Sequence, residues 1–334
     1  MSPLPVFYSP AQRGHDPAGN PERPERAEAL LSAAEAFGAT ARPPDDFGLG
    51  PIGEVHSPGL LALLQTAYRR FAQLKEGPRP AVPDTFAVRE SGGRVPSNIW
   101  AQLGHHCTDD LTPILSGTWD AAYGSAQAAL SAACALRDGA PLAYALCRPP
   151  GHHVYRDLYG GYCYLNNAAI AAHWLSGHGR RPAIIDIDYH HGNGTQAIFY
   201  DRADVFFCSL HADPQEEYPY YAGYPEEMGN GAGEGYTLNL PLPLDTDETS
   251  YLHALAWALD AVEAATPDAL VVSLGFDTLA GDPHGGMRLA PESFRSVGRL
   301  VAGLRRPILL VQEGGYLVEA LPPALTALLE GLTH

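Results

Sequence analysis

AIIDIDYHHGNG, residues 183–194, decides the expected fold, because an apolar run typical of a buried strand leads directly into acidic and histidine residues. Five further apolar runs are typical of strands buried on both faces: 143–147, 205–210, 236–240, 268–275 and 307–312. Segments with helical spacing lie between them, at 165–179, 195–200, 248–265 and 291–304. This alternation predicts a single, mainly parallel β-sheet flanked by helices on both faces. In such sheets, ligands bind beyond the carboxyl ends of the strands.

The N-terminal part of the chain adds two expected helices. Segment 20–38 begins with prolines and continues as an amphipathic helix, and segment 118–136 is an alanine-rich helix suited to packing on the sheet. Residues 78–96 are rich in turn formers and are expected to form a loop. Because no serine-rich or charge-rich linker interrupts the 334 residues, we expect a single domain spanning 1–334.

The chain is strongly acidic. It carries 38 acidic and 21 basic residues, so its formal net charge is −17. A field of this sign opposes binding to a phosphate backbone and favours cationic ligands. We therefore expect no nucleic-acid partner, although solubility alone also explains such a charge.

Cysteine usage and hydropathy bear on the compartment. The five cysteines are scattered singly without CxxC spacing, as expected of buried free thiols. The N-terminus lacks a basic start followed by an apolar core, and no stretch approaches 18 uninterrupted apolar residues. These features predict a cytoplasmic protein that does not associate with membranes.

Acidic and histidine residues gather where two expected strands end. Asp186, Asp188 and His190 alternate along the chain, so in extended backbone their side chains point to one side. Asp277 ends another apolar run, and a buried acid is costly unless it is paired or binds a cation. Asp188, His190 and Asp277 would form a three-ligand zinc site with a position left for water. The alternative is a polar cap on the strand end without a metal.

Two more segments carry groups suited to catalysis. CRPPGHH presents His152 and His153 side by side, a spacing that is poor for chelating zinc and good for acid–base chemistry. VQEGGY places two glycines before Tyr316, which allows the phenol to swing toward the same region. Exposed loop histidines and an ordinary turn are the alternative interpretations.

Five segments resemble motifs of the zinc-dependent histone deacetylase superfamily: RPPGHH, GGYCYLNNAAIA, IDIDYHHGNGTQAIFY, VSLGFD and EGGY. Other stretches look most like the bacterial acetylpolyamine amidohydrolases, among them NPERPER, PDTFAVR and LTPILSGTWDAAYGSAQ. The resemblance covers nearly the whole chain. It implies the arginase and deacetylase fold, with an active site at the carboxyl ends of the strands.

The resemblance implies two metal sites. A catalytic Zn²⁺ would be held by Asp188, His190 and Asp277. A structural K⁺ would be held by Asp186, Ser209 and backbone oxygens that include that of Leu210. This ion would modulate the electrostatics of the zinc site.

The resemblance also implies the catalytic roles. His153 would act as general base and acid, His152 would be its electrostatic neighbour, and Tyr316 would donate a hydrogen bond to the developing oxyanion. Asp186 would orient His152, whereas His153 would have Asn193 as its partner. Because an amide stabilises an imidazolium less than a carboxylate does, His153 should be the less basic of the two histidines.

Substrate contacts follow from the same resemblance. Tyr162 and Tyr218 would line a tunnel that admits an alkyl chain, with Gly161 beside them. Arg26 aligns with an arginine near an internal acetate pocket. His284 falls at the rim position where relatives often carry leucine or methionine.

The resemblance also implies that an entrance loop at about 78–112 restricts access to the tunnel and helps to build a homodimer. His105 and His106 lie in this loop, at positions where aromatic residues are expected. Either they tune the charge that a ligand meets at the tunnel rim, or they are surface variation without functional consequence.

The resulting hypothesis is zinc-dependent deacetylation of small N-acetylated amines such as acetylpolyamines. A deacetylase of acetyl-lysine on proteins or peptides is the alternative enzyme. A non-catalytic protein that binds acetylated ligands is the alternative of another class, and it would be expected to lack a zinc ligand, the base or the tyrosine. A two-manganese hydrolase of the arginase kind would need further Asp and His ligands.

Overall fold

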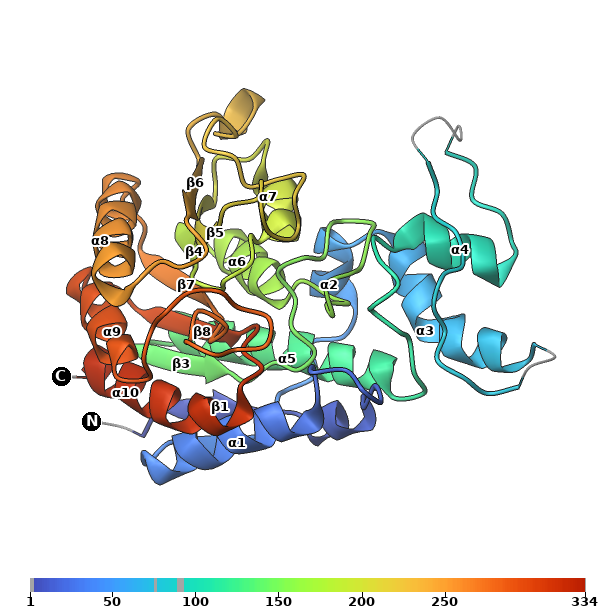
Figure 1. Ribbon diagram of the computed structural model, residues 1–334, viewed down its shortest axis with the longest axis horizontal. Helices are drawn as coiled ribbons and strands as arrows, with labels where there is room; N and C mark the ends of the chain where they lie inside the picture. The colour runs from blue at the N-terminus through green and yellow to red at the C-terminus, as the bar shows by residue number, and fades with distance from the viewer. Residues whose placement is uncertain (1–2, 75–76, 89–92, 334) are drawn as a thin grey trace.

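The computed structural model describes residues 3–74, 77–88 and 93–333 and consists of one central sheet with helices on both faces (Figure 1). All of the strand pairings in this sheet are parallel. The eight strands lie in the order β2 (Thr40–Arg42), β1 (Pro5–Phe7), β3 (Leu142–Ala145), β8 (Ile308–Gln312), β7 (Ala269–Leu274), β4 (Pro182–Asp186), β5 (Phe206–Ala212) and β6 (Thr237–Leu242). The prediction of a mainly parallel sheet is confirmed.

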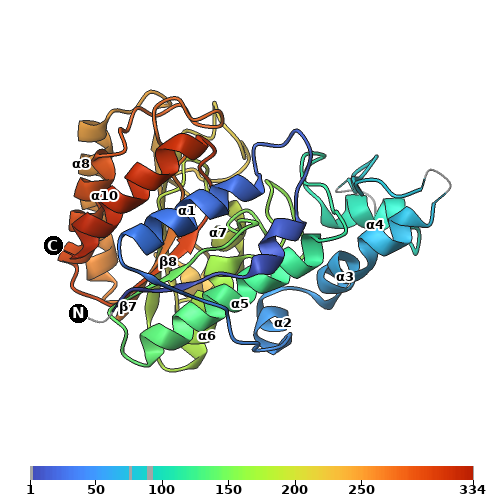
Figure 2. The same ribbon diagram turned by 90° about the horizontal axis from the view of Figure 1, so that it is seen from below.

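Helices cover the two faces in two groups (Figure 2). One group packs on a core that includes Val271 of β7 and Leu309 of β8: α2 (Gly50–Val55), α5 (Thr118–Arg137), α6 (Asn167–Gly177) and, at its margin, α3 (Pro58–Ala72). The other packs on a core that includes Val272 and Leu310: α1 (Pro24–Ala36), α8 (Glu248–Ala264), α9 (Ser293–Gly303) and α10 (Leu321–Thr333). Neighbouring strand residues thus point to opposite cores, as the pleat of a strand requires.

The two N-terminal strands were not predicted. β1 and β2 have three residues each: β1 is apolar but too short to stand out as a run, and all three residues of β2 are exposed. The short helix α7 (Asn193–Phe199) begins directly after the histidine-rich stretch. No helix within the described residues has both the length and the apolar character needed to cross a bilayer.

The expected entrance loop is not a loop throughout. It contains α4 (Ile99–His106), whose N-cap Asn98 accepts a hydrogen bond from the Trp100 amide at 2.9 Å. α3 and α4 project away from the sheet as a lobe, and the ring centroids of Phe71 and Trp100 lie 4.6 Å apart within it (Figure 1). Residues 89–92 of the expected loop lie outside the described residues.

We predict that Leu309→Ala lowers the free energy of unfolding by about 2–5 kcal/mol, because this fully buried side chain on β8 leaves a cavity in a packed core. Denaturant unfolding followed by circular dichroism measures the change. The matched control is Leu49→Ala, since Leu49 is 43% exposed. Equal stabilities for the two variants would contradict this description of the core.

Candidate active site

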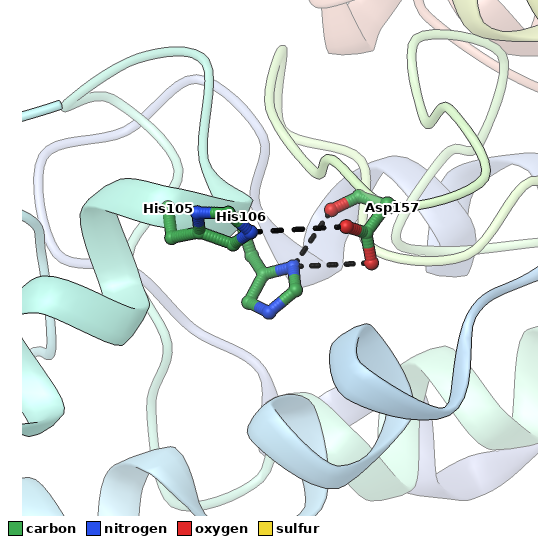
Figure 3. Close-up of side chains that lie close together, drawn as sticks. All are labelled: His105, His106 and Asp157. Carbon is green, nitrogen blue, oxygen red and sulfur yellow. Dashed lines mark hydrogen bonds and ion pairs between the residues drawn. The ribbon is translucent and has the colours of Figure 1, made fainter. Parts of the chain in front are cut away.

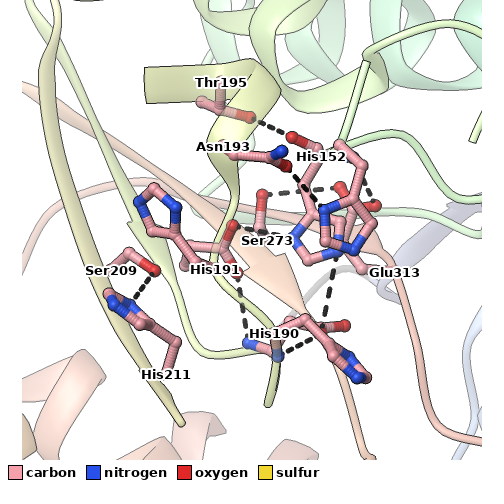
Figure 4. A network of polar contacts seen from close by, with 12 residues as sticks. His152, His190, His191, Asn193, Thr195, Ser209, His211, Ser273 and Glu313 are labelled. Atoms are coloured by element: carbon pink, nitrogen blue, oxygen red, sulfur yellow. Dashed lines mark hydrogen bonds and ion pairs between the residues drawn. The ribbon is translucent and has the colours of Figure 1, made fainter. Parts of the chain in front are cut away.

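The candidate site lies beyond the carboxyl ends of β4, β7 and β8, where the loops that follow these strands meet the loop after β3 (Figure 4). Asp188 comes just after β4, and Asp277 just after β7, its neighbour in the sheet. His190 joins them, and ligand atoms of the three residues all lie within 4.8 Å of one another. Parallel pairing therefore brings these residues together from sequence positions far apart.

The spacing of these three side chains fits a zinc ion. His190 Nδ1 lies 3.3 Å from Asp188 Oδ1 and 3.3 Å from Asp277 Oδ2. Tetrahedral zinc with bonds of about 2.1 Å separates neighbouring ligand atoms by roughly 3.4 Å. Asp277 Oδ2 is buried and makes no hydrogen bond to any residue that the structure describes. A cation would compensate this oxygen, whose burial is otherwise costly.

Backbone groups and glycines hold the two carboxylates in place. Gly314 N donates to Asp188 Oδ2 at 2.8 Å, and Tyr189 N donates to Asp277 Oδ1 at 2.9 Å. A Cβ atom at position 314 would lie 2.3 Å from Asp277 Oδ2, and one at Gly275 would lie 2.2 Å from Asp188 Oδ2. Only glycine therefore allows the chain to pass so close to the carboxylates.

The electrostatics of the cluster also favour a cation. Burial, followed by the charge of Asp188, raises the pKa of Asp277 to about 7. Burial disfavours the imidazolium of His190, but the carboxylates of Asp188 and Asp277 outweigh it and raise the pKa of His190 to about 10. Without a metal, the two buried acids thus stabilise a protonated histidine between them, in the place that a divalent ion would take.

His152 and His153 have unlike surroundings although their ring centroids lie only 4.0 Å apart. His152 Nδ1 is 3.0 Å from Asp186 Oδ2, and His153 Nδ1 is 2.7 Å from Asn193 Oδ1. Burial lowers the pKa of His152, but the charges of nearby carboxylates raise it to about 10. Burial and the neighbouring His152 hold the pKa of His153 well below its usual value. His153 is therefore the neutral member of the pair.

A pocket of about 540 Å³ opens directly above these groups. Its wall includes His153 and His190 together with four residues expected at the tunnel or the oxyanion: Gly161, Tyr162, Tyr218 and Tyr316. Burial raises the pKa of the Tyr316 phenol well above its usual value, so this hydroxyl is a hydrogen-bond donor at neutral pH.

Gly161 and Tyr162 both have positive φ angles, of 59° and 65°. A Cβ atom at Gly161 would lie 2.3 Å from His153 Cδ2, so a glycine is required where the chain passes this ring. A tyrosine in the left-handed region is strained, and such strain is concentrated at functional sites.

Two expected substrate residues differ in where they lie. His284 lines the pocket, with its ring centroid 5.1 Å from that of Tyr316 and 5.9 Å from that of Tyr162. Arg26 is buried beneath the pocket and is not part of its lining among the described residues. Its guanidinium lies over the Tyr316 ring, 4.6 Å from the centroid, and donates to the carbonyl oxygen of Gly315 at 2.5 Å. Arg26 thus positions the loop that carries Tyr316.

The residues expected to hold potassium lie on neighbouring strands. Asp186 pairs in register with Ser209, and Leu210 follows on β5. Asp186 is fully buried, and the Ser209 hydroxyl lies 2.9 Å from His211 Nδ1 (Figure 4). The strand register therefore places the expected oxygen ligands close together.

Sequence reasoning missed two buried acids that organise the site. Glu313 Oε2 accepts from the amides of Gly151 and His152 at 2.6 and 3.1 Å, and burial raises its pKa to about 8. Asp282 Oδ2 accepts from the amide of Tyr316 at 2.6 Å. Glu313 is the first residue of EGGY, and Asp282 lies two residues before His284, but neither acid was among the expected site residues.

His105 and His106 do not contribute to the active-site pocket that the described residues form. They lie at the end of α4, beside Asp157 (Figure 3). The expected role at the rim of the tunnel therefore has no support from their position.

Comparisons with known proteins agree with this geometry. The model of the histone deacetylase domain matches residues 20–332. The acetylpolyamine amidohydrolase of Burkholderia pseudomallei (strain 1710b) is 46% identical over 300 residues, which cover 90% of this chain and 87% of the relative. The acetylpolyamine amidohydrolase of Mycoplana ramosa is 43% identical over 298 residues, 88% of this chain and 87% of the relative.

A crystal structure of acetylpolyamine aminohydrolase from Burkholderia pseudomallei superimposes with a TM-score of 0.94 at 42% sequence identity and covers 98% of each chain. The predictions of the deacetylase fold and of an enzyme are confirmed, against the alternative of a non-catalytic binding protein. The chain therefore belongs to the histone deacetylase domain family and is a deacetylase hydrolase.

Proposed function

We propose that the chain is a zinc-dependent amidohydrolase, a single catalytic domain that removes acetyl groups from small N-acetylated amines such as acetylpolyamines. One observation carries the proposal: the cluster of Asp188, His190 and Asp277 has ligand-atom separations that suit zinc, and its His190 lines one pocket together with His153 and Tyr316. The similarity to named acetylpolyamine amidohydrolases supports the choice of substrate class.

The residues divide the chemistry among them. When bound, zinc would polarise the amide carbonyl and lower the pKa of a water molecule to about 7. Neutral His153 takes a proton from the attacking water and returns it to the departing amine. His152, kept charged by the carboxylates of Asp188 and Asp186, favours the developing negative charge. The Tyr316 hydroxyl donates a hydrogen bond to the oxyanion.

Two carboxylates in the pocket wall favour a cationic substrate. Asp109 and Glu217 both line the pocket. Glu217 Oε1 accepts from the Tyr218 amide at 2.9 Å, and its other oxygen lies 3.3 Å from the Tyr189 hydroxyl. An acetylpolyamine places its acetyl group at the metal and carries an ammonium group farther along the chain. Such an ammonium group would be attracted by these carboxylates.

Assembly, compartment and the second ion are also part of the proposal. Phe86, Val95 and Leu111 are 41%, 45% and 61% exposed on the segment that was expected to build a homodimer. Apolar side chains such as these are removed from water when they are buried in the core of an interface. The five free thiols support a cytoplasmic location.

Asp186, Ser209 and the Leu210 carbonyl are proposed as ligands of a structural K⁺.

We predict that Asp188→Ala and His190→Ala abolish zinc binding at the active site and lower the bound zinc by one ion per chain, whereas Tyr316→Phe keeps this zinc and loses turnover by a factor of about 100–1000, the usual effect of removing one oxyanion donor. Bound zinc and acetate release from acetylputrescine are measured on the same samples. Tyr221→Phe is the matched control, because Tyr221 is 91% exposed. Full activity in Tyr316→Phe would contradict the oxyanion role.

We predict that Glu217→Gln raises KM for acetylspermidine roughly 2- to 5-fold, the effect of a partly exposed ion pair worth about 0.5–1 kcal/mol. KM for uncharged N-butylacetamide should stay unchanged, since this ligand has no ammonium group. Glu216→Gln is the control, because this exposed neighbour is not in the pocket wall. Equal changes for both substrates would argue against ammonium recognition.

We predict that the protein sediments as a dimer and that Phe86→Glu shifts it toward the monomer, because a charge in an apolar interface is costly. Sedimentation equilibrium measures the association. A wild-type monomer at micromolar concentration would overturn the proposed assembly.

A further inference from the structure

A second pocket, of about 510 Å³, lies between α3 and α4, away from the active site. Two of its polar residues, His105 and His106, form the end of α4 (Figure 3). Asp157, another polar residue of this lining, belongs to the segment that continues into Gly161 and Tyr162 of the active-site wall. Ligand atoms of His105, His106 and Asp157 all lie within 4.8 Å of one another.

The distances in this cluster approach those of a metal site. His106 Nδ1 lies 3.3 Å from Asp157 Oδ1, and His105 Nε2 lies 4.0 Å from Asp157 Oδ2. Ligand atoms around tetrahedral zinc are separated by roughly 3.4 Å. The first distance already fits, and the second requires a small movement of the His105 side chain. The two imidazole rings lie nearly perpendicular, with centroids 4.7 Å apart.

The backbone around the cluster is already ordered by hydrogen bonds. Tyr159 N donates to the His106 carbonyl at 2.7 Å, and Thr108 N donates to the Tyr159 carbonyl at 2.9 Å. The hydroxyl of Ser57 hydrogen-bonds to the Asp157 carboxylate. α4 and the segment that carries Asp157 are therefore held against each other before any ion binds, which reduces the entropy lost on binding.

An ion can reach the cluster and displace one hydrogen bond there. The side chains of His105 and Asp157 are 20% and 46% exposed. His106 Nδ1 lies 2.8 Å from the Asp157 carbonyl oxygen, to which it donates when it carries the proton. A metal at Nδ1 requires that proton to move to Nε2. The Nε2 side of the ring faces Gly59. A Cβ atom placed on Gly59 would lie 3.4 Å from His106 Nε2, so glycine leaves space for a proton on this nitrogen.

We propose that His105, His106 and Asp157 form a second metal site, which binds a divalent transition-metal ion such as Zn²⁺ or Co²⁺. Two imidazoles and a carboxylate are ligands that these ions prefer, whereas Mg²⁺ and Ca²⁺ prefer oxygen. The ion would fasten α4 to the segment leading into the active-site wall. The proposal does not depend on the function of the active site.

The test combines substitutions at both sites. Chelator-treated protein is titrated with Zn²⁺ by calorimetry, and bound zinc is counted after dialysis. Asp188→Ala should retain one ion per chain, and Asp188→Ala combined with His105→Gln should bind that ion at least about 10-fold more weakly, since even an outer-shell change costs this much. With Co²⁺, the visible absorption bands of the Asp188→Ala protein should disappear in the double variant.

Two controls make the outcome decisive. Asp188→Ala combined with His253→Gln removes an exposed histidine of α8 and should keep the ion. The melting temperatures of the metal-free variants should agree, which separates ligand loss from unfolding. The proposal is overturned if Asp188→Ala binds no ion, or if neither His105→Gln nor Asp157→Asn weakens binding in that background.

Discussion

The burial of two carboxylates at the ends of neighbouring strands is the constraint on which the rest of the site depends. Asp188 and Asp277 are fully buried at the carboxyl ends of β4 and β7, and their mutual repulsion adds to the cost of burial. Gly275 and Gly314 leave room for these side chains, and backbone amides fix their orientation. A cation at this position relieves the cost, which explains why a stable sheet can end in such a cluster.

The second constraint is the separation of two adjacent histidines into unlike charge states. Asp186 lies against His152, whereas Asn193 lies against His153. The positive charge on His152 disfavours a second positive charge on His153, whose ring centroid lies 4.0 Å from that of His152. His153 therefore stays neutral and is able to accept a proton. Glu313 holds the amides of Gly151 and His152, so a buried acid also fixes the turn that presents the pair.

Much of this arrangement could be predicted from the sequence. Six strands are long apolar runs, and parallel pairing then requires residues at their carboxyl ends to converge. β2 was not predicted because its exposed residues have no hydrophobic pattern. α4 was not predicted because the segment before it is rich in proline and glycine and was therefore expected to form a loop. Glu217 directly precedes Tyr218, an expected tunnel residue, but no role was expected for it. Its place in the pocket wall depends on how the chain folds after β5, which spacing alone does not determine.

The central claim is that a metal held by Asp188, His190 and Asp277 makes this protein a hydrolase of small acetylated amines. The most direct measurement is the rate of acetate release from acetylputrescine by chelator-treated protein, before and after zinc is returned, with an acetyl-lysine peptide as the competing substrate. We expect negligible turnover without metal, recovery with zinc, and a higher kcat/KM for acetylputrescine than for the peptide. Undiminished turnover by the metal-free protein, or a clear preference for the peptide, would contradict it.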